Sequence, residues 1–213
     1  MHIVDRTLTF VRGFIMSYGP SSIKKMLWDK EFSGTKWDFI DDTGGDCVYP
    51  FLEKYARGGD ILDLGCGPGN TANELACGAY RSYVGVDISQ AALDKAVKRT
   101  KESGRDQKNS FTQSDFLGYG PVKEFDVILF RESLYHVPFG QVKPILDKFS
   151  KDLKNGGVFV VRLYAGDAKP GKIKWRVQRK LDLIKRNFDV VESRQFETPG
   201  YPTVIVFRPR GQA

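Results

Sequence analysis

The sequence predicts an α/β fold, with a mostly parallel sheet of seven strands, helices on both faces and a C-terminal antiparallel hairpin. From Asp60 onward, short apolar runs alternate with helical patterns, which is typical of parallel strands joined by crossover helices. One run, residues 125–130, is almost entirely apolar, as expected of a central strand that is covered on both faces. A glycine-rich loop, residues 65–69, directly follows the first run. These three observations predict a single layered α/β sheet.

Local patterns define the first half of this sheet. Strands and helices are expected to alternate over residues 60–64, 70–78, 82–86, 89–104 and 109–113. Ser89 is suited to cap its helix, because a serine hydroxyl accepts a hydrogen bond from a free backbone N–H of the first turn. Leu93 and Ala96 recur at helical spacing on the inner face, and Gly104 provides the C-terminal stop.

The second half of the chain continues the alternation. Strands are expected over residues 125–130, 158–164, 188–195 and 203–208, and helices over residues 139–153 and 169–186. Pro199 and Gly200 mark a turn between the last two strands, which are therefore expected to form the closing hairpin. Residues 1–59 read as a mostly helical extension.

The loop after the first strand is the most informative motif. Asp63, Gly65, Gly67 and Gly69 follow the spacing D-x-G-x-G-x-G between a predicted strand and a predicted helix. Glycines let the backbone turn tightly and approach a ligand closely, and the helix that follows presents free N–H groups. The next strand ends at Asp87, where a carboxylate can accept hydrogen bonds from both hydroxyls of a ribose. A nucleotide-type cofactor is therefore expected at this edge of the sheet.

Over residues 60–208 the sequence resembles the Rossmann-like class I S-adenosylmethionine-dependent methyltransferases, with the extension typical of small-molecule members. The alternative is a dinucleotide-binding dehydrogenase. Dehydrogenase loops usually space their glycines G-x-G-x-x-G to seat a pyrophosphate, whereas this loop is G-x-G-x-G. Asp63 would repel a pyrophosphate but suits a cationic amino-acid group. The resemblance implies a cofactor-binding catalytic domain over residues 60–213 and an extension or lid over residues 1–59.

The resemblance also implies S-adenosyl-L-methionine as cofactor, S-adenosyl-L-homocysteine as product and a set of contacts with them. The backbone at residues 65–67 would pass under the methionine and ribose, Asp63 would brace or contact the amino group, and Asp87 would hold the ribose. At the adenine, Ile88 would pack on the ring and Asp115 would meet the exocyclic amine. The full expected set is Trp37, Asp63, Gly65, Cys66, Gly67, Asn70, Asp87, Ile88, Asp115, Phe116 and Arg131. An ordinary loop role stays open for Asp115 and for Phe116, which would lie alongside the adenine.

The methyl acceptor is expected beyond the strand 125–130, because ligands of open α/β sheets sit at the carboxyl ends of the strands. His136 and Tyr135 are the candidate catalytic residues there. A hydroxyl acceptor benefits from a general base, so His136 would either take a proton or orient the acceptor. A histidine that packs beneath the cofactor is the alternative. Tyr135 and Glu132 would line the same pocket, or Arg131 and Glu132 would pair with each other or with the N-terminal lid. The resemblance implies that the backbone carbonyl of Arg131 meets the methionine ammonium.

Two tryptophans of the extension, Trp28 and Trp37, are candidates for covering the sulfonium of the cofactor. A cation over an aromatic face gains roughly 0.5–2 kcal/mol. The alternative is that both pack the extension onto the sheet, which is favoured for Trp28. The amphipathic stretch of residues 3–15 is expected to pack on the domain or on a second subunit in preference to a membrane surface.

Composition narrows the class of protein. The 213-residue chain is 41% hydrophobic and 28% charged, which excludes a fibrous or wholly disordered protein. Its formal charge of +7 matches the excess within residues 169–186, where eight basic residues stand against one acidic residue. A crossover helix with a solvated basic face explains that excess. Three cysteines without metal-ligand spacing predict reduced thiols, no metal site and a cytoplasmic protein.

Together these observations predict an enzyme that transfers a methyl group in line to an oxygen or nitrogen nucleophile of a small molecule, such as a sugar, a glycoconjugate intermediate or a secondary metabolite. The chain is expected to act as a monomer or homodimer. One alternative is an RNA methyltransferase steered by residues 169–186. The other is a non-catalytic scaffold that keeps the cofactor fold.

Overall fold

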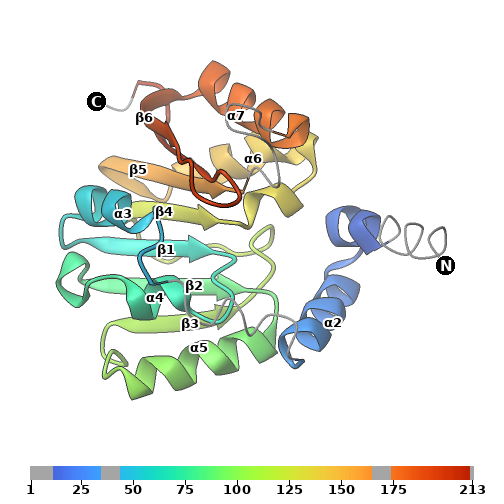
Figure 1. The fold of residues 1–213 in the computed structure, drawn as a ribbon, viewed down its shortest axis with the longest axis vertical. Helices are drawn as coiled ribbons and strands as arrows, with labels where there is room; N and C mark the ends of the chain where they lie inside the picture. The colour runs from blue at the N-terminus through green and yellow to red at the C-terminus, as the bar shows by residue number, and fades with distance from the viewer. Residues whose placement is uncertain (1–11, 35–43, 165–173, 212–213) are drawn as a thin grey trace.

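Seven strands form one sheet in the computed structural model, which describes residues 12–34, 44–164 and 174–211 (Figure 1). Their order across the sheet is β3-β2-β1-β4-β5-β7-β6. The strands are β1 (Asp60–Leu64), β2 (Ser82–Asp87), β3 (Asn109–Gln113), β4 (Phe125–Arg131), β5 (Leu153–Leu163), β6 (Asp189–Gln195) and β7 (Thr203–Arg208). The helices are α2 (Ser21–Phe32), α3 (Tyr49–Ala56), α4 (Asn70–Glu74), α5 (Gln90–Glu102), α6 (Phe139–Ser150) and α7 (Trp175–Asn187), with 3₁₀ turns η2 (Cys77–Ala79) and η3 (Leu134–His136).

The pairing of the strands confirms the predicted fold class. Strands β1 to β5 pair in parallel, and β7 runs antiparallel to both β5 and β6. Chain order reverses between β1 and β4, which are neighbours in the sheet. Ligands of open α/β sheets bind at such a switch point, outside the carboxyl ends of the strands.

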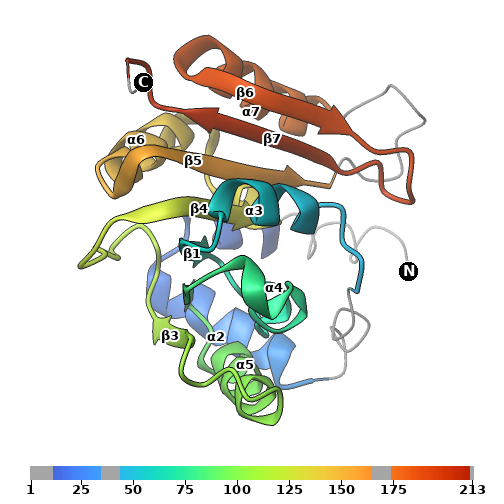
Figure 2. The same ribbon diagram turned by 90° about the vertical axis from the view of Figure 1, so that its left-hand side faces the viewer.

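Each face of the sheet is covered by its own apolar core. Because side chains alternate along a strand, Ile61 of β1 joins the core under α3 and α4, whereas Leu62 and Leu64 join the core under α6 and α7. Figure 2 shows α3 and α4 in front of the sheet and α6 and α7 behind it. Helix α3 contacts β4 and β5, so residues 49–56 pack with the sheet although they precede the predicted domain boundary at residue 60.

Some elements differ from the sequence-based expectations. The helix expected over residues 70–78 is divided into α4 and η2, and Arg131 is the last residue of β4 where it was expected just beyond it. The charges of the basic segment were expected on a solvated face, but Lys180 is only 5% exposed. This residue lies three positions after Val177 and four before Ile184, on the buried face of α7. The expected part of this helix before residue 174 lies outside the described residues.

Helix α2 lies beside the carboxyl ends of the parallel strands, as Figure 1 shows. It contacts α5, and Figure 2 shows it behind the lower half of the sheet. The same edge carries the loops that follow β1, β2, β3 and β4. Helix α2 is therefore placed to contact residues from several of these loops.

Candidate active site

The glycine loop after β1 has the backbone that its sequence predicts. Gly65, Gly67 and Gly69 have φ angles of 87°, 53° and 75°, in the left-handed region that favours glycine. A Cβ on Gly65 would lie 2.4 Å from the Cβ of Ser133, and a Cβ on Gly69 would lie 2.7 Å from that of Ala96. At Gly67 the nearest atom would be Cζ of Phe32, at 3.8 Å. The loop thus packs tightly on both sides of Gly67 and is more open at Gly67 itself.

Asp87 at the end of β2 braces this loop. Its Oδ2 accepts a hydrogen bond from the backbone N–H of Gly67 at 2.8 Å, and its Oδ1 accepts one from that of Ser89 at 2.9 Å. Burial raises the pKa of Asp87, while the backbone hydrogen bonds favour its charged form. Each carboxylate oxygen can accept a second hydrogen bond, so Asp87 can still receive ribose hydroxyls. Ile88, the next residue, is half-buried.

Asp63 presents an unpaired buried carboxylate oxygen beside the same loop. The Tyr83 hydroxyl donates to its Oδ2 at 2.5 Å, but Oδ1 has no hydrogen-bond partner among the residues that the structure describes. Burial, with a smaller effect of the Asp87 charge, raises the pKa of Asp63 to about 7, against the hydrogen bonds of Tyr83 and Thr71 and the positive charge of Arg131. A buried acceptor without a donor is costly, and an ammonium group is the kind of partner that would satisfy it.

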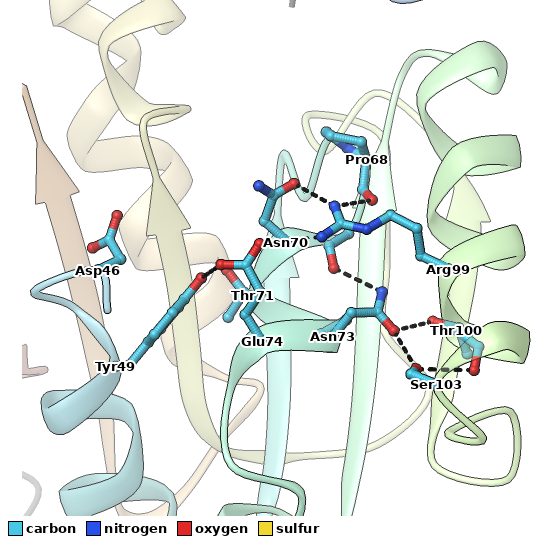
Figure 3. A network of polar contacts seen from close by, with 12 residues as sticks. Asp46, Tyr49, Pro68, Asn70, Thr71, Asn73, Glu74, Arg99, Thr100 and Ser103 are labelled. Atoms are coloured by element: carbon cyan, nitrogen blue, oxygen red, sulfur yellow. Dashed lines mark hydrogen bonds and ion pairs between the residues drawn. The ribbon is translucent and has the colours of Figure 1, made fainter. Parts of the chain in front are cut away.

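Asn70 and Cys66 hold the loop from within. Figure 3 shows Arg99 of α5 reaching across to Asn70 and Pro68: its guanidinium donates to Oδ1 of Asn70 at 3.0 Å and to the carbonyl of Pro68 at 3.3 Å. The same guanidinium pairs with Glu74 at 3.1 Å. Cys66 is buried, which raises the pKa of its thiol well above the ordinary value, so it is no nucleophile. In this structure the two side chains support the loop.

The loop after β3 contains the residues expected at the adenine. Asp115 accepts a hydrogen bond from the hydroxyl of Ser21 at 2.6 Å and another from the backbone N–H of Leu117 at 3.0 Å. Phe116 packs edge-to-face with Phe130 of β4, with 6.1 Å between ring centroids. Asp115 therefore lies beyond the carboxyl end of β3, where it contacts the start of α2, and Phe116 lies against the core.

Arg131 and Glu132 belong to a chain of ion pairs. Arg131 pairs with Asp46 at 2.7 Å, Asp46 also pairs with Arg162 at 3.2 Å, and Arg162 pairs with Glu132. Arg131 also donates to the Tyr49 hydroxyl at 3.4 Å. The side chain of Arg131 therefore pairs with the N-terminal extension, through Asp46 in the segment before α3. Glu132 pairs with Arg162 of β5 and not with Arg131. Asp46 and Arg162 lacked any signal in the sequence, because their partners are far away along the chain.

His136 lies under helix α2. The Trp28 ring meets its imidazole edge-on, with 5.2 Å between ring centroids. The pKa of His136 is lowered to about 4. Burial is the largest cause; the positive charges of Lys180, Arg12 and Lys24 lower the pKa as well, and the negative charge of Glu31 raises it in part. His136 is therefore neutral at pH 7. The side chain of Tyr135 and all of Trp37 lie outside the described part of the structure.

Helix α2 contacts three of the site loops, which the sequence did not indicate. Asp29 accepts hydrogen bonds from the Ser89 hydroxyl at 2.8 Å and from the backbone N–H of Ala91 at 3.2 Å, at the N-terminus of α5. Ser21 donates to Asp115, and Phe32 faces Gly67. One helix thus touches the loops after β1, β2 and β3. An aspartate and a serine on a helix are common surface residues, so nothing in the sequence singled them out.

Two further properties concern metals and membranes. Residues 12–34, 44–164 and 174–211 hold no group of three or more His, Cys, Asp or Glu side chains arranged to bind a metal ion. Over the same ranges, no helix has the length and apolarity needed to cross a bilayer. Most of the amphipathic stretch of residues 3–15 lies outside the described ranges, and Phe14 at its end is 58% exposed.

Sequence comparison identifies the part of the chain that carries the glycine loop. Residues 61–157 match a family described as a methyltransferase domain. Sterol 24-C-methyltransferase erg6 of Aspergillus fumigatus is 30% identical over 139 residues, which cover 60% of this chain and 36% of that protein. A 27-O-demethylrifamycin SV methyltransferase of Amycolatopsis mediterranei is 29% identical over 119 residues, covering 53% and 44%. The chain therefore spans less than half the length of these curated relatives.

Comparison with solved structures shows the same fold. The N-methyltransferase NodS of Bradyrhizobium japonicum, in complex with S-adenosyl-L-homocysteine, superposes with a TM-score of 0.67. The match has 19% identity and covers 87% of this chain and 98% of that one. At this identity the likeness concerns the fold, which is the class I methyltransferase fold expected from the glycine loop.

Proposed function

We propose that this chain, whose residues 61–157 form a methyltransferase domain on the class I fold, transfers a methyl group from S-adenosylmethionine to an oxygen or nitrogen of a small molecule. The observation that carries the proposal is the unpaired Oδ1 of Asp63, buried beside a glycine loop that Asp87 holds in place. An amino-acid ammonium is a fitting partner for that oxygen.

The described residues fit the cofactor at each of its polar ends. Asp63 would hold the ammonium, Asp87 the ribose hydroxyls, and Asp115 the adenine amine. Gly65, Cys66 and Gly67 would line the path between them, with Asn70 and Arg131 beside it and Ile88 and Phe116 at the adenine. Trp37, which belongs to the expected set, lies outside the described residues. When bound, the cofactor supplies an electrophilic methyl group on a sulfonium. The residues of the chain then need only bind, orient and exclude water, since alignment of the nucleophile accounts for much of the acceleration.

His136 and Tyr135 would act on the acceptor. A base whose pKa is about 4 accepts a proton poorly at pH 7. The neutral imidazole of His136 is suited to accept a hydrogen bond from the incoming hydroxyl or amine, so its proposed role is to orient the acceptor. The two curated relatives act on a sterol and on a rifamycin by their names, which supports a small-molecule acceptor.

An RNA acceptor is the second candidate, and its support is Trp175, which is 61% exposed on the basic helix α7. Two observations weaken it. The guanidinium of Arg179 lies 5.2 Å from the centre of the Trp175 ring, and Lys180 is buried. Methyl transfer to bulk RNA at low salt tests this candidate, since RNA binding through α7 would fall steeply as salt rises.

Titration calorimetry with S-adenosylhomocysteine tests the main proposal. Micromolar binding is expected, and labelled methyl groups should appear on a small hydroxyl or amine compound from a panel of such acceptors. The proposal would be overturned if neither S-adenosylmethionine nor S-adenosylhomocysteine bound to the protein. Binding without transfer to any acceptor, and with no effect of replacing His136, would favour the scaffold alternative.

A further inference from the structure

Lys180 is a buried cation that the proposed site does not yet use. It lies on the inner face of α7, and only 5% of it is exposed. Its Nζ donates hydrogen bonds to two backbone carbonyls, that of Leu134 at 2.8 Å and that of Val137 at 2.7 Å. A charged lysine is rarely buried to this extent unless it is paired or hydrogen-bonded, and here both acceptors belong to one short segment.

That segment is the turn η3, which follows β4 and carries Tyr135 and His136. Within the turn, the His136 N–H bonds to the Ser133 carbonyl at 3.1 Å and the Val137 N–H bonds to the Leu134 carbonyl at 3.1 Å. The Ser133 hydroxyl ties the start of the turn to the carbonyl of Leu64, at the end of β1, at 2.5 Å. Lys180 bonds to Leu134, the first residue of the same turn, and to Val137, the residue directly after it. Its ammonium thus restrains the backbone that carries His136.

The charge of Lys180 acts on the imidazole as well. Burial and, to a smaller extent, the positive charge of Arg176 on the same helix lower the pKa of Lys180 to about 8, so the ammonium is mostly charged at pH 7. After burial, Lys180 is the largest cause of the lowered pKa of His136. The other charges that act on His136 are Arg12, from the helical residues 12–18 that precede α2, and Lys24 and Glu31 from α2.

An apolar side chain of similar length would fill the space of Lys180 without the cost of burying a charge. What the ammonium adds is the pair of carbonyl hydrogen bonds and the positive charge near His136. We propose that Lys180 is a positioning residue, which fixes the turn of residues 134–136 through the Leu134 and Val137 carbonyls and places a positive charge against His136. This inference rests on the proposed function only in assigning that turn to the methyl acceptor.

The chain has two histidines, so the test has a clean signal. In a His2→Gln background, the imidazole resonances of His136 are the only ones in the spectrum. Lys180→Met should raise the pKa of His136 toward its ordinary value of about 6.5 and shift the amide signals of residues 134–137. Lys185→Met is the matched control, because Lys185 is exposed on the same helix, and it should change neither. An unchanged His136 titration in a folded Lys180→Met protein would overturn the proposal.

Two measurements keep the proposal testable if Lys180→Met does not fold. In the wild-type protein, the amide signals of residues 134–137 should follow a titration with a midpoint of about 8, which belongs to Lys180. Lys180→Arg keeps the charge and should hold the pKa of His136 low, while moving this titration out of the accessible range. Wild-type amide signals that do not change between pH 7 and 9 would contradict the proposal.

Kinetics separate this inference from the proposed function. Lys180→Met should leave the affinity for S-adenosylhomocysteine within about twofold of wild type, because the two hydrogen bonds of its Nζ go to Leu134 and Val137, which are not among the residues assigned to the cofactor. It should lower kcat/KM for the acceptor by at least about tenfold, and Lys180→Arg should restore part of the loss. Wild-type protein that does not bind the cofactor would refute the proposed function and leave the NMR result standing. Full activity of Lys180→Met would refute the positioning role alone.

Discussion

The carboxylate of Asp87 accepts a hydrogen bond from the backbone N–H of Gly67 across 2.8 Å. This contact joins the end of β2 to the middle of the glycine loop that follows β1. Of the three glycines of the loop, Gly67 has the most space around it: among the described residues, a Cβ there would have one atom within 4 Å, Cζ of Phe32. The proposed cofactor cradle therefore depends on a residue that holds the loop and also offers its remaining lone pairs to a ligand.

Replacing Asp87 with alanine should weaken S-adenosylhomocysteine binding by at least about tenfold, because it removes the loop contact and the proposed ribose acceptor together. Calorimetry measures the change. Asp94→Ala is the matched control, since Asp94 is an exposed carboxylate on α5, and it should bind like wild type. Equal affinity of the two variants would remove Asp87 from the cofactor site.

Helix α2 is expected to loosen when its contact with α5 is removed. Asp29→Ala deletes the acceptor of the Ser89 hydroxyl and the Ala91 N–H, an interaction worth about 1 kcal/mol. Amide hydrogens of residues 21–32 should then exchange about fivefold faster, as measured by mass spectrometry. Lys30→Ala changes an exposed neighbour on the same helix and should leave exchange unaltered. Unchanged exchange in Asp29→Ala would show that other contacts hold α2.

The buried ion pairs around Asp46 should contribute much more to stability than an exposed pair. Asp46→Ala leaves Arg131 and Arg162 without this carboxylate, at side-chain exposures of 13% and 16%, and should cost about 3–5 kcal/mol in the free energy of unfolding. The control, Asp147→Ala, breaks an exposed pair with Lys143 on α6 and should cost about 0.5 kcal/mol or less. Urea unfolding measures both. Similar losses in the two variants would contradict the buried network.

The sequence predicted the features that local patterns determine. Local patterns predicted all seven strands, although β5 begins at Leu153 and was expected only from residue 158. The spacing of Gly65, Gly67 and Gly69 predicted a loop whose φ angles are indeed positive. The features it missed depend on residues that meet only in three dimensions. Asp29 accepts hydrogen bonds at the start of α5, 60 residues away along the chain, and Lys180 was expected on a solvated face but is buried.

Lys180 could still have been identified from its position. It falls on the apolar stripe between Val177 and Ile184, and a charge in such a stripe indicates a buried partner. Arg131 had no comparable signal, because its partner Asp46 lies outside any element and is 85 residues away. The number of strands thus follows from periodicity, whereas the partners of a charge follow from the packing of the whole chain.

The central claim of the proposed function is that the unpaired oxygen of Asp63 binds the ammonium of the cofactor. The affinity of the protein for the cofactor should therefore depend on pH. With the pKa of Asp63 raised to about 7, the carboxylate is mostly protonated at pH 6 and mostly charged at pH 8. Only the charged form pairs with the ammonium of S-adenosylhomocysteine. The affinity should therefore rise by up to about tenfold over this range.

The decisive measurement is the dissociation constant of S-adenosylhomocysteine at pH 6 and pH 8 for wild-type protein and for Asp63→Asn. The wild-type protein should bind more tightly at pH 8, and the variant should bind more weakly than wild type at pH 8 with little dependence on pH. Wild-type affinity that stays constant with pH, together with an equal affinity of Asp63→Asn, would contradict the account.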